Sequence, residues 1–236
     1  MGDFPYDLTP STLPAMGLIV LRVDETIEQD FRRAIAPDAT RLHITRVQSG
    51  DDLTPDSIAA METQLTTAAS LLPPAGFDVV GYACTSGTAQ IGAERVGDLV
   101  RAGVQTRHVT NPLSAALAAF ADRGVTRVGI VSPYVASVAA PLRTAFMEAG
   151  VEVTGTVSFG EEVEARVARI EPKSIANAAR ALAARSAMDA VFLSCTNLRT
   201  FDILPVLEAE LGMPVFSSNQ VLAWHMARLA EFSSAW

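Results

Sequence analysis

Short runs of apolar, often β-branched residues alternate along the chain with longer segments in which apolar positions recur at helical spacing. The short runs predict strands, and the longer segments predict amphipathic helices. The predicted strands are 17–21, 42–47, 78–84, 106–110, 127–131, 152–158, 190–195 and 214–216, and the predicted helices are 28–35, 55–72, 89–102, 114–122, 135–149, 173–185 and 204–211. This alternation is typical of an α/β fold, in which helices connect the strands of a parallel sheet.

Two strand segments recur at nearly the same spacing. The run Gly-Leu-Ile-Val-Leu-Arg-Val from Gly17 has a counterpart in Gly-Ile-Val-Ser-Pro-Tyr-Val from Gly129. The run from Phe77 resembles the run from Met188, and the distance along the chain between these two runs is almost equal to that between the first two. Because two separate segments agree on one spacing, they predict a duplicated unit.

The repeat predicts two pseudo-symmetric halves, each an open parallel sheet of flavodoxin-like type. We expect residues 1–112 and 217–236 to form the first half and residues 113–216 to form the second. Open α/β sheets bind their ligands just beyond the carboxyl ends of the strands. The active site is therefore predicted in the cleft between the halves.

The two cysteines of the chain occupy equivalent positions in the repeat. Cys84 ends one predicted strand and Cys195 ends another, and each is followed by threonine. A free cysteine is often only a small buried hydrophobe, and a pair can form a disulfide. The equivalent positions favour instead a pair of functional thiols. Backbone N–H groups at a following helix would lower the pKa of each thiol and favour the thiolate.

Two thiols on opposite faces of one bound molecule suit two kinds of chemistry. One thiolate can remove a proton next to a carboxylate while the other thiol delivers a proton to the opposite face. Alternatively, a thiolate can add to an activated double bond, allow rotation and leave again. Both routes develop negative charge that needs hydrogen-bond donors. The candidate donors are the polar residues that follow the cysteines, namely Thr85, Ser86, Thr196 and Asn197.

Charge and composition exclude several classes of protein. The 18 Lys and Arg are scattered among 26 Asp and Glu, for a net charge of −8, so neither a nucleic acid nor an anionic membrane is an expected partner. The chain shows no basic signal-peptide start and no apolar run of about 20 residues, which predicts a soluble, cytoplasmic protein. The apolar helix at 114–120 suggests a homo-oligomer.

Metal and cofactor signals are weak. His43, His108 and His225 stand alone, without the spacing of metal ligands, so we assign them no catalytic role. No glycine-rich nucleotide-binding pattern occurs in the sequence. The prediction is a site that uses no metal and no cofactor.

The segments Tyr-Ala-Cys-Thr-Ser-Gly-Thr around Cys84 and Leu-Ser-Cys-Thr-Asn-Leu around Cys195 resemble the paired cysteine motifs of the aspartate/glutamate racemase superfamily. The resemblance points to its maleate isomerase and arylmalonate decarboxylase branch, and there to the racemase-like proteins of ectoine utilisation. It implies that Tyr134 and the hydroxyls of Thr85 and Ser86 bind a substrate carboxylate. The alternatives are a cleft-lining aromatic ring and helix-capping hydroxyls.

Two departures from the family pattern bear on the reaction. Arylmalonate decarboxylases carry glycine where this chain has Cys84, so the second thiol argues against decarboxylation. Maleate isomerases show an asparagine where this chain has Asp24. An aspartate would repel a dicarboxylate and attract an ammonium group, and Arg22 nearby could then hold a carboxylate. Alternatively, Asp24 caps a helix and Arg22 is its solvated neighbour.

The sequence thus leads to three hypotheses. The first is a cofactor-independent racemase or epimerase of a small amino acid or related carboxylate, aspartate-like or ectoine-derived. The second is a maleate-type cis–trans isomerase, and the third is a non-catalytic protein that binds a small metabolite. Arg166 and Arg169 would either close over the substrate as part of a mobile lid or remain solvated.

Overall fold

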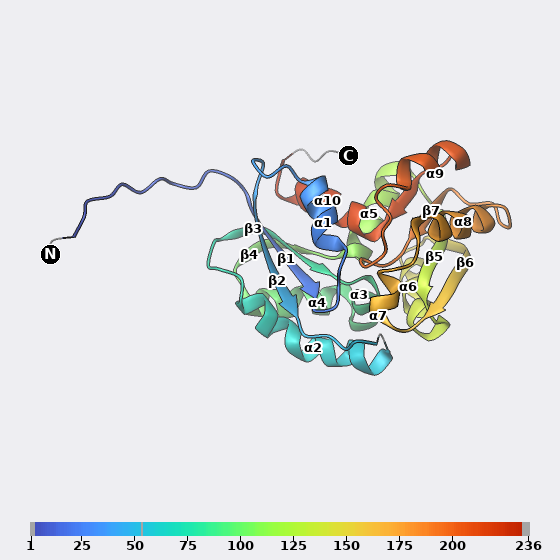
Figure 1. Cartoon of the computed structure of the whole chain (residues 1–236), viewed down its shortest axis with the longest axis horizontal. Helices are drawn as coiled ribbons and strands as arrows, with labels where there is room; N and C mark the ends of the chain where they lie inside the picture. Colours follow the sequence, from blue (N-terminus) through green and yellow to red (C-terminus); the bar gives the residue numbers. More distant parts are fainter. Residues whose placement is uncertain (1–2, 53, 233–236) are drawn as a thin grey trace.

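Two four-stranded parallel sheets form the framework of the protein. The structure is a computed structural model that describes residues 3–52 and 54–232. The first sheet has the order β2-β1-β3-β4 and the second has the order β6-β5-β7-β8. The strands are β1 (Ala15–Leu21), β2 (Arg41–Val47), β3 (Phe77–Ala83), β4 (Thr106–Thr110), β5 (Arg127–Tyr134), β6 (Glu152–Glu161), β7 (Ala190–Leu193) and β8 (Val215–Ser217). The predicted α/β class with two parallel sheets is confirmed (Figure 1).

The strand register agrees with the internal repeat. Gly17 in β1 pairs with Val80 in β3, and Gly129 in β5 pairs with Val191 in β7. The second pair is the counterpart of the first at the spacing that the sequence shows. The repeated segments are therefore the two central strands of each sheet, and their carboxyl ends lead into equivalent loops.

Ten helices connect and cover the strands in the described part of the chain. They are α1 (Ile27–Ala34), α2 (Pro55–Ser70), α3 (Thr85–Ile91), α4 (Ala93–Gly103), α5 (Pro112–Arg123), α6 (Ala136–Glu148), α7 (Glu164–Val167), α8 (Pro172–Ala183), α9 (Leu204–Leu211) and α10 (Ser218–Leu229). The prediction of one helix over 89–102 is wrong. Gly92 adopts φ 95°, a conformation that L side chains rarely adopt, and it separates α3 from α4.

Helix α10 was not predicted and returns the chain to the first sheet. Its residues Leu222 and Met226 pack with Met16 and Leu18 of β1 and with Val79 of β3. A capping box of Ser217 and Gln220 begins the helix, and this pattern was the local signal for it. The division of the chain near residues 112 and 217 stays a prediction.

The apolar face of α5 is buried within the chain. Ala115, Ala116, Ala119 and Phe120 belong to the same core cluster as Val221 of α10. The premise that the apolar helix at 114–120 is exposed is therefore wrong, because the chain itself covers this face. A homo-oligomer remains a prediction without that support.

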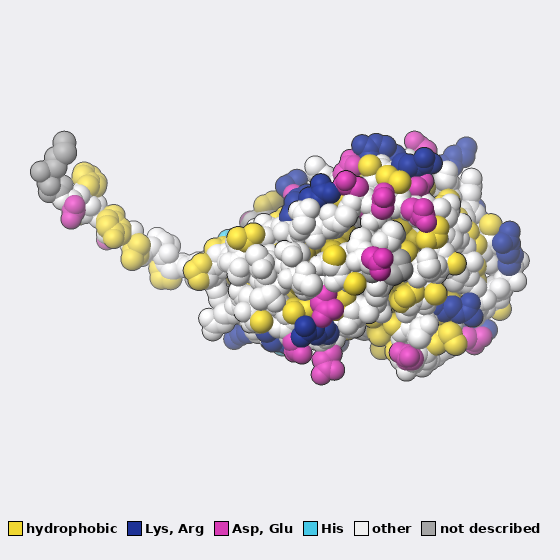
Figure 2. Space-filling view, turned by 90° about the horizontal axis from the view of Figure 1, so that it is seen from below, with side chains coloured by type: hydrophobic (Ala, Val, Ile, Leu, Met, Phe, Trp, Pro, Cys, Tyr) yellow, Lys and Arg dark blue, Asp and Glu magenta, His cyan; other side chains and the backbone are white. Residues whose placement is uncertain are grey.

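The surface carries charges of both signs. Figure 2 shows acidic and basic side chains intermixed on the face it presents, and the arm before β1 extends away from the body. Phe4 and Tyr6 in this arm are exposed. Within residues 3–52 and 54–232, no helix combines the length and apolar character that crossing a membrane requires.

Candidate active site

Cys84 lies where β3 passes into α3. It is the N-cap residue of this helix, which begins four residues earlier than the predicted one, and its Sγ accepts a hydrogen bond from the Gly87 N–H at 3.2 Å. A Cβ added at Gly87 would lie 2.8 Å from the sulfur and 2.7 Å from the Tyr82 hydroxyl oxygen, so only glycine permits this approach. The Tyr82 hydroxyl makes no hydrogen bond of normal geometry, yet it lies close enough to lower the pKa of Cys84. Backbone geometry therefore holds this thiol.

Cys195 follows β7 in a different local structure. Residues 196–203 form turns and bends, and α9 begins only at Leu204, so the prediction that Cys195 repeats a helix N-terminus is wrong. Its φ of 120° is rare for a residue with a side chain and costs about 1–3 kcal/mol. Its sulfur lies 2.8 Å from the Tyr134 hydroxyl oxygen and accepts the Asn197 N–H at 3.2 Å. The surroundings of this sulfur therefore include a titratable side chain, Tyr134, as well as a backbone N–H.

Ser218, the first residue of α10, joins the two cysteine loops. Its hydroxyl oxygen lies 2.8 Å from the Thr85 hydroxyl oxygen and accepts the Cys195 N–H at 3.0 Å. The Thr196 hydroxyl reaches the Ala83 carbonyl oxygen at 3.4 Å. Loops that are far apart in the chain thus meet in one buried site.

Glu164 is a site residue that the sequence does not reveal. It begins α7 and is only 1% exposed. Its carboxyl accepts hydrogen bonds from the Tyr134 hydroxyl at 2.7 Å and from the Asn197 side-chain amide at 2.8 Å. Its own N–H donates to the Asp51 carbonyl oxygen at 3.1 Å. Because Glu164 lies in a charged stretch of the sequence, it resembles the solvated acids beside it.

Asp24 fulfils the capping role that the sequence left open. Its Oδ1 accepts the N–H groups of Thr26 and Ile27 at 2.8 and 2.9 Å. Its Oδ2 is buried without a hydrogen bond of normal geometry, with Thr196 near enough to lower the pKa of Asp24. One carboxylate oxygen therefore holds the start of α1, and the other has no such partner.

The remaining predicted residues divide into buried and exposed groups. Thr85 and Ser86 are buried in the turn after Cys84, and their role in binding a carboxylate stays a prediction. Arg22 is 42% exposed and instead binds Asp51 and the Ser49 carbonyl oxygen. To hold a substrate carboxylate, Arg22 would have to leave Asp51.

The two lid arginines are exposed and occupied by ion pairs. Arg166 pairs with Glu161, and Arg169 pairs with Glu25 at 2.9 Å. These contacts match the solvated alternative. The backbone of this region nevertheless spans the two halves, because Val163 forms an antiparallel bridge with Asp52.

Burial controls the protonation of the site. Desolvation raises the pKa of Cys84 to about 12, although the Gly87 N–H opposes the shift. Burial, followed by the charge of Glu164, raises the pKa of Cys195 well above its ordinary value, against hydrogen bonds from Tyr134 and Asn197. The prediction that the loops favour a resting thiolate is therefore wrong for this closed site. Burial likewise raises the pKa of Asp24 and Glu164.

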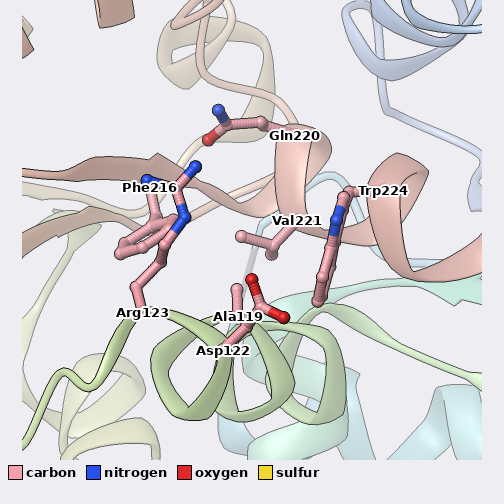
Figure 3. Close-up of a pocket in the computed structure, with 7 residues that line it drawn as sticks. All are labelled: Ala119, Asp122, Arg123, Phe216, Gln220, Val221 and Trp224. Carbon is pink, nitrogen blue, oxygen red and sulfur yellow. The ribbon is translucent and has the colours of Figure 1, made fainter. Parts of the chain in front are cut away.

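Both sulfurs are shielded from solvent, with Cys84 3% and Cys195 4% exposed. The pocket in Figure 3 lies elsewhere, between α5 and α10, where Arg123 lies beside Phe216 and Trp224 lines the opposite side. A substrate can therefore reach the thiols only if the site opens. In the described part of the chain, no group of three or more His, Cys, Asp or Glu is placed to hold a metal ion.

The model of the arylmalonate decarboxylase family matches residues 37–235. The chain belongs to this family. Its relative from Bordetella bronchiseptica, an arylmalonate decarboxylase, is 33% identical over 108 residues, which is 45% of either protein. The family also includes maleate isomerases within the aspartate/glutamate racemase superfamily. A relation to proteins of ectoine utilisation stays a prediction.

Two maleate isomerases resemble this family member over nearly its whole length. The maleate isomerase of Pseudomonas putida KT2440 is 22% identical over 229 residues, which cover 92% of this chain and 91% of that enzyme. The Nocardia farcinica maleate cis-trans isomerase was solved as a cysteine-to-serine variant with a covalently bound succinylcysteine intermediate. That structure superposes with a TM-score of 0.83 at 22% identity, over 93% of this chain and 94% of its own.

Proposed function

We propose that this protein is a cofactor-independent isomerase that converts a maleate-like cis diacid into its trans isomer by reversible thiolate addition. The carrying observation is that the buried loops holding Cys84 and Cys195 contact each other through Ser218, which lies within hydrogen-bond distance of Thr85 and accepts the Cys195 N–H. Similarity to maleate isomerases over nearly the whole chain supports this reaction. The succinylcysteine in the Nocardia farcinica enzyme is an intermediate of the kind that thiolate addition produces.

The different surroundings of the two thiols suggest their roles. The Cys84 sulfur accepts a hydrogen bond from the Gly87 N–H. This fixed donor stabilises a thiolate once the site opens to substrate and the sulfur is less desolvated. Cys195 lies 2.8 Å from the Tyr134 hydroxyl oxygen, so its proton has a defined hydrogen-bond partner. Cys84 therefore suits the nucleophile, and Cys195 suits the acid and base.

The proposed reaction balances its atoms and charges. Cys84 first loses its proton to solvent while the site is open. The Cys84 thiolate then forms a C–S bond to one alkene carbon, and the displaced electron pair is stabilised by the neighbouring carboxylate. The Cys195 thiol gives its proton to the second carbon, and the former double bond rotates as a single bond. Cys195 then recovers a proton, and the C–S bond breaks to release the trans diacid. Thr85 and Ser86, buried beside Cys84, are the donors that would hold one carboxylate. The Thr196 hydroxyl already donates to the Ala83 carbonyl oxygen and the Asn197 amide to Glu164, so these two residues would hold the second carboxylate only by exchanging those bonds.

A second candidate function is racemisation of a small amino acid, and the buried acids favour it. Asp24 and Glu164 both lie near the thiols, since each raises the pKa of Cys84 and of Cys195. The free Asp24 Oδ2 suits a substrate ammonium group better than a second carboxylate, because opposite charges stabilise the ionised form. A zwitterion such as an aspartate-like amino acid meets this condition.

One experiment separates these functions. The purified protein is incubated in heavy water with maleate and, separately, with L-aspartate, and both reactions are followed by proton NMR. Cis–trans isomerisation predicts the olefinic signal of fumarate from maleate. Exchange of the α-proton of aspartate without conversion of maleate would overturn the first proposal in favour of racemisation. Inert maleate together with inert aspartate would contradict both assignments. A Cys84→Ser, Cys195→Ser double variant is the matched blank.

A further inference from the structure

A continuous chain of hydrogen bonds connects Glu164 to Cys195. The Tyr134 hydroxyl donates to Glu164 Oε1 at 2.7 Å, and its oxygen lies 2.8 Å from the Cys195 sulfur. All three side chains are buried. The carboxyl, the phenol and the thiol therefore form one line along which protons can shift.

Asn197 determines where a proton can lie on Glu164. The Asn197 side-chain oxygen accepts the Glu25 N–H at 2.8 Å, which orients its amide NH2 group toward the carboxyl. That group donates to Glu164 Oε2 at 2.8 Å and to the Glu164 carbonyl oxygen at 3.2 Å. Oε2 is thus an acceptor only, so a proton on Glu164 must lie on Oε1, facing Tyr134.

Two arrangements of this line contain the same number of protons. In the first, Glu164 is ionised, Tyr134 donates to it, and Cys195 is a thiol that donates to the phenol oxygen. In the second, Glu164 is protonated and donates to Tyr134, which donates to a Cys195 thiolate. They differ only by a concerted shift of two protons, and each has a single negative charge.

We propose that Glu164 is the proton acceptor and donor for Cys195 and acts through the Tyr134 hydroxyl. This inference rests on the proposed two-thiol isomerase and names the group that sets the protonation of its acid. Binding of a diacid dianion beside this line adds one proton to it, so that Glu164 and Cys195 are both protonated before the reaction. When Cys195 gives its proton to the substrate carbon, Tyr134 returns a proton to the sulfur and Glu164 returns one to Tyr134. The carboxylate then holds the charge until the reverse transfer restores the proton. Glu164 is therefore a positioning residue, because it acts on the sulfur through the Tyr134 hydroxyl.

The charged surroundings favour one negative charge on this line rather than two. Asp24 faces the line from the turn after β1, and Cys84 faces it from the start of α3. Arg46 lies behind Asp24 and donates to the Asp24 carbonyl oxygen at 3.1 Å. Burial and the neighbouring acids raise the pKa of both Glu164 and Cys195. Ionising both ends together is costly, so losing the proton at one end favours retaining it at the other.

The backbone holds Glu164 in place for this role. Its N–H donates to the Asp51 carbonyl oxygen at 3.1 Å, and the preceding Val163 pairs with Asp52. Both partners follow β2 in the first half of the molecule, whereas Cys195 follows β7 in the second. The carboxyl is thus anchored from outside the loop that it serves.

The test is residue-resolved alkylation of the two thiols across a range of pH. Iodoacetamide is applied to the wild type, to Glu164→Gln, to Tyr134→Phe and to the double variant, and the Cys84 and Cys195 peptides are quantified by mass spectrometry. Glu162→Gln is the matched control, because it makes the same change at an exposed acid of the same segment. The rate at Cys84 reports opening of the site, although loss of the Glu164 charge should by itself raise that rate, because Glu164 also raises the pKa of Cys84.

We call the proton exchange between Glu164 and Cys195 through Tyr134 the relay. It predicts that the alkylation rate of Cys195 in the wild type is nearly independent of pH between about 6 and 8, because the two arrangements interconvert without gaining or losing a proton. Glu164→Gln should lower the Cys195 rate about tenfold near pH 6.5 relative to the wild type, while the Cys84 rate stays equal or rises. Tyr134→Phe should cause the same loss, and the double variant should lose no more than either single one.

An unchanged or faster Cys195 rate in Glu164→Gln would overturn the relay, since that result is expected if Glu164 only adds negative charge. Additive losses in the double variant would also overturn it. Alkylation needs no substrate, so these results stand whether or not maleate is converted. Failure of the relay and failure of the proposed isomerisation are therefore separately visible.

Discussion

The loops that carry Cys84 and Cys195 start from equivalent strands and diverge at once. Cys84 has an ordinary extended φ of −148° and caps a helix whose backbone N–H contacts its sulfur. Cys195 has a φ of 120° and lies in a turn, where the Tyr134 side chain contacts its sulfur. The first thiol is held by backbone that does not titrate. The second belongs to a line of side chains that exchange protons.

This difference shows what a duplicated fold preserves. Repetition of the strands keeps a thiol at the carboxyl edge of each sheet, because sheet geometry determines where a strand ends. The loop after the strand then determines the chemistry of each thiol. Two halves that match in topology can therefore supply a nucleophile and an acid from the same residue type.

Replacing each thiol in turn should give the largest contrast between the loops. Cys84→Ser should lower turnover of maleate at least about 10⁴-fold, since it removes the nucleophile. Cys195→Ser should instead accumulate an adduct on Cys84, because a solvent proton can complete the addition, whereas the base that removes a proton for elimination is lost. Intact-protein mass spectrometry after incubation with maleate measures the adduct. An adduct on Cys195 in the Cys84→Ser variant would reverse the assigned roles.

Adding a methyl group to the Cys84 loop should cause the next largest loss of activity. A Cβ at Gly87 would meet the sulfur at 2.8 Å, so Gly87→Ala should displace the thiol and lower kcat about 100-fold. The control is Gly97→Ala in α4, where the added Cβ meets only the movable end of Arg101. We expect Gly97→Ala to retain activity and to gain up to about 1 kcal/mol in unfolding free energy. Equal activity of the two variants would contradict a backbone-held Cys84.

The Cys195 loop is connected to a buried acid, Asp30, which makes the stability of the protein depend on pH. Asn219 links Asp30, at 2.7 Å, to the Thr196 carbonyl oxygen at 2.8 Å. Burial raises the pKa of Asp30 from 3.8 to about 6. Its contribution to stability is therefore complete below about pH 3.8 and is lost as pH rises to about 6, at a cost of up to about 3 kcal/mol.

The variant Asp30→Asn tests this cost. Its unfolding free energy should match that of the wild type near pH 4 and exceed it by up to about 3 kcal/mol at pH 7. Urea unfolding at several pH values between 4 and 7 measures the difference. A constant difference over that range would mean that the folded protein does not hold the Asp30 proton as described.

Removing the bridge between the loops should have the smallest effect. Ser218→Ala deprives the buried Cys195 N–H and the Thr85 hydroxyl of their common partner, which should cost about 1–2 kcal/mol of unfolding free energy. Ser70→Ala, which removes an exposed hydroxyl bonded to the Thr67 carbonyl oxygen, should change stability little. Equal losses in the two variants would show that Ser218 does not join the loops energetically.

The sequence by itself determined the strands, their duplication and the places of the two thiols. Apolar runs that repeat at one nearly constant spacing predict central strands in two sheets, and those strands are β1, β3, β5 and β7. Such patterns are local, because a buried strand must be apolar along its own length. The placement of Cys84 at the start of a helix was predictable for the same reason.

Only the tertiary structure decided the environment of those thiols. Glu164 reaches Tyr134 across 30 residues of sequence, and Ser218 reaches Thr85 across 133. The sequence predicts thiolates, whereas the folded protein holds thiols with a raised pKa. Desolvation by the whole fold raises the pKa of each thiol by more than a few nearby N–H groups lower it. Burial and contacts between distant segments exist only once the chain is folded, so no local pattern of residues contains them.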